Sequence, residues 1–293
     1  MSTSTAAVTA PGSTTAPPAD RPRGGTGAAL RWELTKLAAQ ARARYALAFC
    51  LLAPIAIVFV VNGQGRPPKD TLYGRFIHQS GYAVPLLVLG FAGQWVLPLL
   101  TALVAGDIFA SEDQHGTWKT ILTRSTSRAQ VFWAKTITAL LFAIGALVVL
   151  AASTILSSVL IVGSAPLTGL TGQTIPAGTA AKLVVESWGT ALAPMIGFTC
   201  LAIFLSVRAR STAFGVAAPV VIAMVMQLIG SLGGIERIRP ALLTTPLESW
   251  HGLFAQPAFH SPLTTGLIVS AAWSLVTLAA AFISLLRRDI TGG

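Results

Sequence analysis

The feature that most constrains the fold of this chain is a set of six apolar stretches. Each stretch contains a run of about 20 residues without a charged side chain. A charge at the centre of a spanning helix costs roughly 2.5–3.5 kcal/mol on insertion scales, so such runs predict transmembrane helices. One run alone fits a buried helix of a soluble protein, but six in 293 residues do not. The sequence therefore predicts an all-α integral membrane protein. The predicted spans lie near Tyr45–Val61, Ala83–Ala105, Val131–Val162, Ser187–Val207, Ser211–Ile235 and Thr264–Leu286.

The small number of charged residues and their distribution along the chain are consistent with a lipid bilayer as its solvent and main partner. Only 10% of the residues are charged, whereas a soluble domain carries about 25%. The net charge of +10 comes from short basic clusters between apolar runs, which argues against a nucleic-acid partner. If both termini are cytoplasmic, 14 of the 20 Lys and Arg residues fall in inner segments and 6 in outer ones. The positive-inside rule therefore favours cytoplasmic termini and an even number of spans.

The first 29 residues differ in composition from the rest. They are rich in Ser, Thr, Ala, Pro and Gly without a continuous apolar core, which predicts a disordered cytoplasmic tail over residues 1–29 and one membrane domain over residues 30–293. In Leu30–Arg44, apolar residues alternate with charged ones. This pattern fits an amphipathic helix in the interface, and it also fits a plain cytoplasmic flank that sets the topology.

The connection Asp107–Gln130 between the second and third spans is the most informative stretch. Acidic residues lie at its start and basic residues toward its end, an order that suits a helix dipole. Ser111 with Gln114, and Ser127 with Gln130, have the spacing of a capping box. We therefore expect one short surface helix, followed by a newly capped third span. The alternative is a solvated connection with no further role.

The order of residue types in this connection resembles a known family signature. From Ala110 the chain reads Ala-Ser-Glu112-x-x-x-Gly116-Thr117-x-x-x-Ile121-Leu122-Thr-x-x-x-Ser127-Arg128, and Lys135 follows. This string resembles the signature after the second span of type-2 ABC exporter permeases, which are six-span bacterial membrane subunits. The Leu30–Arg44 segment is similar to the N-terminal elbow helix of that family. The resemblance covers nearly all of the chain after residue 29, with Ser125 where members often have proline.

The resemblance implies a function in ATP-driven export across a bacterial plasma membrane. Such permeases act as homodimers or heterodimers, and each half docks a cytoplasmic ATP-binding subunit that holds the ATP and Mg²⁺. The expected substrate is hydrophobic, amphipathic or lipid-linked. The connection would be the coupling helix that contacts the ATP-binding subunit, through Asp107, Glu112, Gly116, Thr117, Lys119 and Arg128.

Three residues of this connection carry more specific expectations. Glu112 would accept a salt bridge or backbone hydrogen bonds from the partner, so Glu112→Arg should impair docking or coupling without disturbing folding. Arg128 and Lys135 lie on one helix face, where they either bind lipid headgroups or stabilise the connection. For the long outer segment Gly234–Leu263, the resemblance implies short re-entrant helices, and the alternative is an ordered outer loop.

The chain carries no Walker A string and no zinc or nucleophile motif, so we expect no catalytic, cofactor or metal residues in it. It should not be an enzyme by itself. Ionisable residues inside the predicted spans are nearly missing, which weakens a second hypothesis, a stand-alone secondary transporter or channel. A third hypothesis is a membrane scaffold or immunity protein that transports nothing. It would need no ATP-binding subunit.

Overall fold

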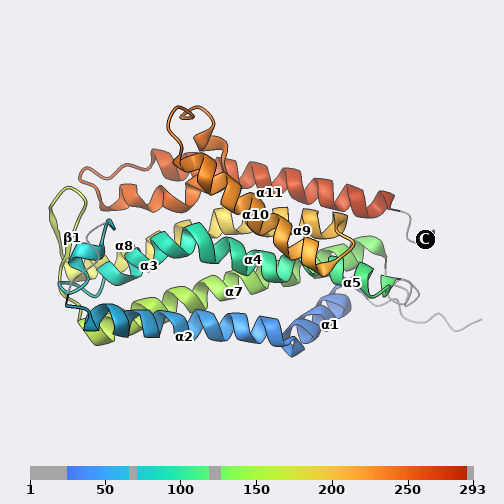
Figure 1. Ribbon diagram of the computed structural model, residues 1–293, viewed down its shortest axis with the longest axis horizontal. Coiled ribbons are helices and arrows are strands. Elements are labelled where there is room, and N and C mark those ends of the chain that lie inside the picture. Colours follow the sequence, from blue (N-terminus) through green and yellow to red (C-terminus); the bar gives the residue numbers. More distant parts are fainter. Residues whose placement is uncertain (1–24, 66–70, 119–126, 289–293) are drawn as a thin grey trace, which may run out of the picture.

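The computed structural model describes residues 25–65, 71–118 and 127–288, whose long helices run side by side in one elongated bundle (Figure 1). Six helical segments in this part of the chain are long and apolar enough to cross a membrane: Ala41–Gly63, Ala83–Ala105, Arg128–Val162, Ala177–Arg208, Thr212–Ser231 and Ser261–Arg287. The predicted all-α membrane fold is confirmed. The two ends of the bundle are named below after the elements that lie there, the α5 end and the β1 end (Figure 1).

The spans are assembled from shorter elements. The first part of the chain forms α1 (Thr26–Ala39), α2 (Ala41–Gly63), η1 (Gly74–Phe76), α3 (Ala83–Phe91), the π-helical turn η2 (Ala92–Val96) and α4 (Leu97–Ala105). The rest forms α5 (Ala110–Gln114), α7 (Arg128–Val162), β1 (Leu167–Thr168), β2 (Thr174–Ile175), α8 (Ala177–Thr190), α9 (Leu192–Arg208), α10 (Thr212–Ser231), the 3-10 segments η3 (Arg239–Ala241) and η4 (Thr245–Phe254), and α11 (Ser261–Arg287). The two short strands pair antiparallel, with Leu167 opposite Ile175.

The fourth span is longer than predicted. It begins at Ala177 rather than at Ser187, because α8 and α9 continue through a turn at Ala191 as one membrane-length segment. A search for charge-free runs stops at Lys182 and Glu186. Both side chains are exposed near the β1 end, where they form an ion pair of 3.7 Å one helical turn apart. Charges that reach solvent in this way do not interrupt a span.

The fifth span is shorter than predicted. It ends at Ser231 rather than at Ile235, because Leu232 already has extended backbone and Gly234 turns the chain with a φ of 84°. A left-handed φ of this kind favours glycine, so the helix stops although the sequence remains apolar.

The segment Leu30–Arg44 is helical, as the elbow interpretation expects, but Gln40 interrupts it. Gln40 has extended backbone, so α1 ends before it and the remaining residues belong to α2. α1 packs along α7, and its one buried side chain is the carboxylate of Glu33, while the indole of Trp32 remains exposed. A charged group therefore anchors this helix to the bundle.

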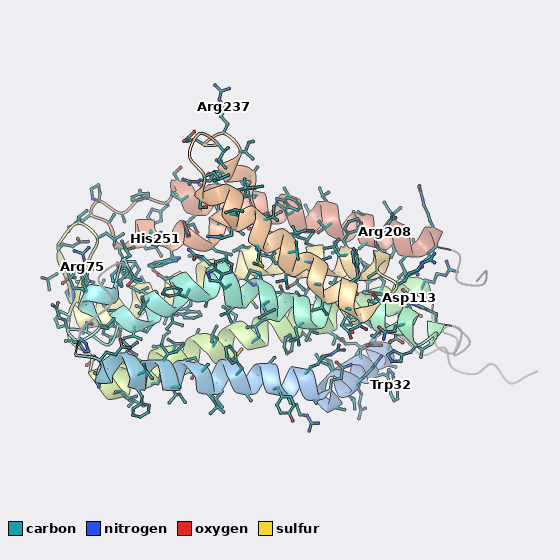
Figure 2. All side chains as sticks on the ribbon, viewed as in Figure 1. Trp32, Arg75, Asp113, Arg208, Arg237 and His251 are labelled. Carbon is teal, nitrogen blue, oxygen red and sulfur yellow. The ribbon has the colours of Figure 1, made fainter. Side chains whose placement is uncertain are left out.

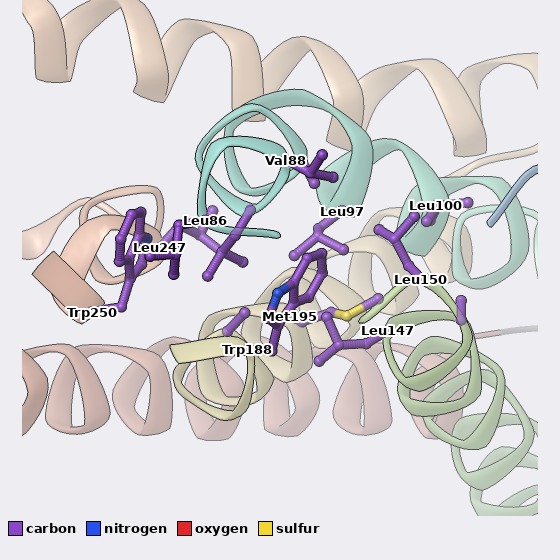
Figure 3. Close-up of a cluster of buried hydrophobic side chains, with 14 of the residues drawn as sticks. Leu86, Val88, Leu97, Leu100, Leu147, Leu150, Trp188, Met195, Leu247 and Trp250 are labelled. Atoms are coloured by element: carbon purple, nitrogen blue, oxygen red, sulfur yellow. The ribbon is translucent and has the colours of Figure 1, made fainter. Parts of the chain in front are cut away.

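Apolar side chains from separate helices interdigitate in the core. Figure 3 shows this cluster, which includes Leu86, Val88, Leu97, Leu100, Leu147, Leu150, Trp188, Met195, Leu247 and Trp250. Lipid tails are as apolar as these side chains, so close packing rather than removal from water holds spans together. Small residues permit the closest approach: a Cβ on Gly106, after α4, would lie 2.3 Å from the carbonyl oxygen of Gly215 in α10.

The segment between α10 and α11 turns back into the bundle. The Nε1 of Trp273, near the middle of α11, donates to the carbonyl of Ala241 at 2.9 Å. Leu247 packs on Gly93 near the middle of the second span, where an added Cβ would meet its Cβ at 3.4 Å. Figure 2 shows Arg237 projecting from the side of the bundle, between the levels of Arg75 and Asp113. The segment is thus re-entrant, as the resemblance implies, and not an ordered loop at the surface.

Candidate coupling site at the α5 end

The helix α5 ends in a turn that requires glycine. Gly116 has a φ of 62°, its N–H donates to the carbonyl of Asp113 at 3.2 Å, and the N–H of Thr117 donates to the carbonyl of Glu112 at 3.0 Å. These two bonds form a Schellman motif, in which a left-handed residue after the helix satisfies its last carbonyls. Of the two features that a glycine favours, a close approach or a turn, the structure has a turn at Gly116.

The start of α5 is capped differently from the prediction. The N-cap is Phe109, and Ser111 makes no capping bond. Instead the Oγ of Ser206 in α9 accepts hydrogen bonds from the N–H groups of Phe109 at 3.0 Å and Ala110 at 3.1 Å. The side-chain oxygen of Gln114 accepts from the N–H of Thr212, at the first turn of α10, at 2.8 Å. The start of α5 is thus capped from α9, and Gln114, one of the two residues expected to cap α5 locally, connects it to α10 instead.

The second predicted capping box is confirmed. The Oγ of Ser127 accepts from the N–H of Gln130 at 3.2 Å, and the side-chain oxygen of Gln130 accepts from the N–H of Ser127 at 2.9 Å. This reciprocal pair satisfies two free donors at the start of α7.

A buried cluster of four charges joins α1, α5 and α7. The Nζ of Lys135, fully buried in α7, lies 3.0 Å from Glu33 of α1 and 2.8 Å from Glu112 of α5. Lys36 of α1 also bonds Glu112. The ring of Phe109 covers the Lys135 ammonium, with its centroid 5.9 Å from the Nζ. Two acids and two bases make the cluster formally neutral, which offsets the cost of burying them.

The carboxylate of Glu112 is stabilised in its charged form. Burial alone would raise its pKa, but attraction to Lys135 and hydrogen bonds from Lys135, Lys36 and Thr117 outweigh burial and lower the pKa to about 2. The group therefore remains ionised at every physiological pH.

The other acids of this connection are paired with distant bases as well. Asp107, also buried, bonds Arg42 at the start of α2. Asp113 bonds Arg288, just after α11, at 2.6 Å. Arg128 donates to the carbonyl of Arg288 at 2.7 Å. Each of these ion pairs joins the connection to a different span, so α5 lies at the centre of a bonded set of helix ends.

The structure divides the predicted coupling residues into groups. Asp107 and Glu112 are buried and bond other helices, and the half-buried Thr117 bonds Glu112 within the connection, whereas Gly116 is exposed at the tip. Arg128 is the first residue of α7, and its side chain bonds the backbone just after α11. Lys119 lies outside the described residues, as do Arg124 and Ser125.

The burial of Glu112 corrects one expectation. Its carboxylate is engaged by donors of the same chain, so Glu112→Arg would disturb folding and is no clean test of docking. Lys135 is fully buried, which excludes headgroup binding and leaves its role in stabilising the connection.

Sequence reasoning missed Glu33, Lys36 and Ser206 as members of this site. The signal that could have indicated ion pairs within the chain is the presence of three acids in a connection with basic residues on both sides.

Replacing Gly116 by alanine is expected to destabilise the α5 turn by about 1–2 kcal/mol, because an L-residue is strained at a positive φ. No atom lies within 4 Å of an added Cβ, so the strain is purely conformational. Gly116→Asn should cost less, since asparagine tolerates this region. Thermal unfolding of the three proteins in detergent measures the difference, and equal midpoints for alanine and asparagine would contradict the assignment.

The described residues contain no group of three or more His, Cys, Asp or Glu side chains placed to hold a metal ion. What the α5 end offers instead is a small exposed tip, formed by Gln114, His115 and Gly116, on a helix bonded to the ends of the spans.

The fold and this site define a multi-pass membrane protein whose spans are bonded at one end to a short helix. Residues 29–230 match the family model described as ABC-2 family transporter protein. The chain therefore belongs to the ABC-2 transporter family and is a membrane permease subunit of an ABC transporter. Members of this family associate with an ATP-binding subunit and are generally not catalytic themselves. No curated protein matches the chain.

Proposed function

We propose that this permease forms the translocation path of an ATP-driven exporter and that its ATP-binding subunit docks on the tip of α5. The chain itself holds no nucleotide, and ATP and Mg²⁺ bind the partner. The α5 end is cytoplasmic, together with both termini, in a bacterial plasma membrane. The basic residues gathered at this end support that orientation.

The single observation that carries the proposal is the set of bonds that leaves α5. It is bonded to α1 and α7 through Glu112, to α9 through Ser206, and to α10 through Thr212. A displacement of α5 by the closing ATP-binding subunits would therefore move several spans at once. The crossing of Gly106 and Gly215 adds a direct backbone contact between the connection and α10.

A second permease chain, identical or homologous, covers the open face of α10. This helix leaves several large apolar side chains exposed, namely Phe214, Val221, Met224, Val225 and Leu228. The segment after α10 bears Arg237 at a level between the two ends of the bundle (Figure 2). Charged, non-helical backbone at membrane depth is tolerated only where protein or a water-filled cavity surrounds it. A dimer interface around a path for a hydrophobic, amphipathic or lipid-linked substrate meets this requirement.

The docking proposal predicts that His115→Glu reduces co-purification of the ATP-binding subunit at least several-fold. His115 is exposed at the tip, so a new negative charge there changes the docking surface while the buried ion pairs persist. The matched control is His260→Glu. His260 is an exposed histidine just before the start of α11, whereas the end of α11 lies beside α5. The measurement is a mild-detergent pull-down from the native host, with mass spectrometry of proteins that carry a Walker A string.

The outcomes separate the hypotheses. A stoichiometric ATP-binding protein that is lost in His115→Glu and kept in His260→Glu supports docking at α5. An equal yield from both variants moves the docking surface elsewhere. A chain that purifies without any such protein, under conditions that preserve known complexes, favours a stand-alone transporter or a scaffold.

A further inference from the structure

A cavity of about 830 Å³ lies between the second span and α10. Its walls are mainly apolar and include Trp95, Val225 and Leu228, and a few polar groups are set among them, notably Gln94, Gln227 and Glu248. This size and this composition are typical of sites for small organic ligands. The cavity opens on the face of α10 that the proposed second chain would cover.

The polar side of the cavity is built by a local irregularity in the second span. Gln94 and Trp95 lie in the π-helical turn η2, which interrupts an otherwise regular helix. Such turns redirect side chains and are frequent at functional sites. Here the Nε2 of Gln94 donates to the Oε1 of Glu248 at 3.1 Å, while about half of the Trp95 side chain remains accessible.

Glu248 has an exposed side chain that lines the cavity, and it forms no ion pair among the described residues. The half-buried imidazole of His251, three residues further on, is an ionisable group that interacts with it electrostatically. The hydrogen bond of Glu248 to Gln94 places it beside the middle of the second span, although the sequence assigns it to an outer segment. Arg239 also lines the cavity, but its Nε donates to the carbonyl of Gly230 at 2.7 Å, at the negative end of the α10 dipole. An ionisable group at this depth is costly unless a partner compensates it.

We propose that the cavity binds an amphipathic ligand that carries an amine, guanidinium or onium group, with Glu248 as the counter-ion of that cation. The Trp95 indole offers a second favourable surface for the cation, through cation–π attraction. The apolar wall formed by α10 accommodates the hydrophobic part of the ligand. That this ligand is the transported substrate rests on the proposed function, whereas the binding site itself does not.

The test uses tetraphenylphosphonium, a hydrophobic cation, as its probe. Its binding to the purified full chain in phosphatidylcholine nanodiscs is measured by equilibrium dialysis, with empty nanodiscs subtracted. We expect saturable binding to the wild type and a Kd about ten-fold higher for Glu248→Gln, which removes the charge and little volume. Glu248→Asp keeps the charge and should bind within a few-fold of the wild type. The matched control is Glu186→Gln, at an exposed acid on α8 outside the cavity.

Neutral triphenylphosphine oxide should displace the probe about ten-fold more weakly than unlabelled tetraphenylphosphonium. Equal Kd values for the wild type and Glu248→Gln, or no saturable binding to the wild type, would overturn the inference. If the ATP-binding subunit still co-purifies in that case, the proposed function stands and only the cavity assignment fails. Charge-dependent binding through Glu248 without any co-purifying subunit would support the site and contradict the proposed function instead.

Discussion

Replacing Lys135 by methionine is expected to lower the free energy of unfolding by about 3–5 kcal/mol, because it leaves Glu33 and Glu112 as buried carboxylates without their shared cation. Methionine is unbranched and only one atom shorter than lysine, so the loss reflects mainly the missing charge. The control is Lys182→Met, which breaks an exposed ion pair worth at most about 1 kcal/mol. Denaturation in mixed detergent micelles, followed by tryptophan fluorescence, compares the two variants.

The pH dependence of the stability gives an independent measure of how much the ion pairs of this cluster contribute. Folding lowers the pKa of Glu112 from 4.5 to about 2, so its contribution to stability is full above pH 4.5 and is lost as the pH falls toward 2. Lys135→Met removes the cation that lowers this pKa most, so the denaturation midpoint of the variant should change less over that pH range than the wild-type midpoint. A double variant, Lys135→Met with Glu112→Gln, should recover part of the loss. A double variant less stable than Lys135→Met would contradict the ion-pair account.

Replacing Gly215 by alanine is expected to separate α10 from the end of α4. The added Cβ would lie 2.2 Å from the carbonyl oxygen of Gly106 and 2.9 Å from the Cβ of Ala110. The first neighbour is backbone and cannot rotate away, so the helices must move apart, at a cost of about 1–3 kcal/mol. Because Gly106 directly precedes Asp107, the same change should weaken the connection between α5 and α10 and reduce ATP-driven transport.

Gly145→Ala is the matched control for Gly215→Ala. Gly145 lies within α7, and no atom lies within 4 Å of an added Cβ there. Alanine has a higher helix propensity than glycine, so this variant should be neutral or up to about 1 kcal/mol more stable. Thermal unfolding and transport in proteoliposomes measure both variants. Equal behaviour of Gly215→Ala and Gly145→Ala would show that the close crossing has no role in stability or coupling.

Local sequence information sufficed where the physical cause is local. The positions of the spans follow from the cost of placing each charge in hydrocarbon, which is a property of single residues summed over a window. The capping box of Ser127 and Gln130 joins groups three residues apart, and the turn at Gly116 depends on the backbone freedom of one residue. These features could be predicted without knowledge of the tertiary structure, and the structure contains them.

Other local rules failed because a distant group took part. Ser111 has the spacing of a cap for α5, yet Ser206 of α9 occupies that role. The exposed charges Lys182 and Glu186 shortened the predicted fourth span, although they lie on a continuous helix. In both cases the residues have the spacing or the charge that the rule requires. The rule failed because the solvent exposure and the hydrogen-bond partners of these side chains depend on the whole bundle.

The sequence by itself determined that this chain is a six-span membrane protein with a structured connection after its second span, because hydropathy and capping act over short distances along the chain. Only the tertiary structure decided which way the acids of that connection face. It brings Glu33, Glu112 and Lys135 together from three helices, and it places Glu248 beside Gln94, level with the middle of the second span. Coulomb energy depends on separation in space and on the surrounding dielectric, and neither quantity is encoded in residue spacing.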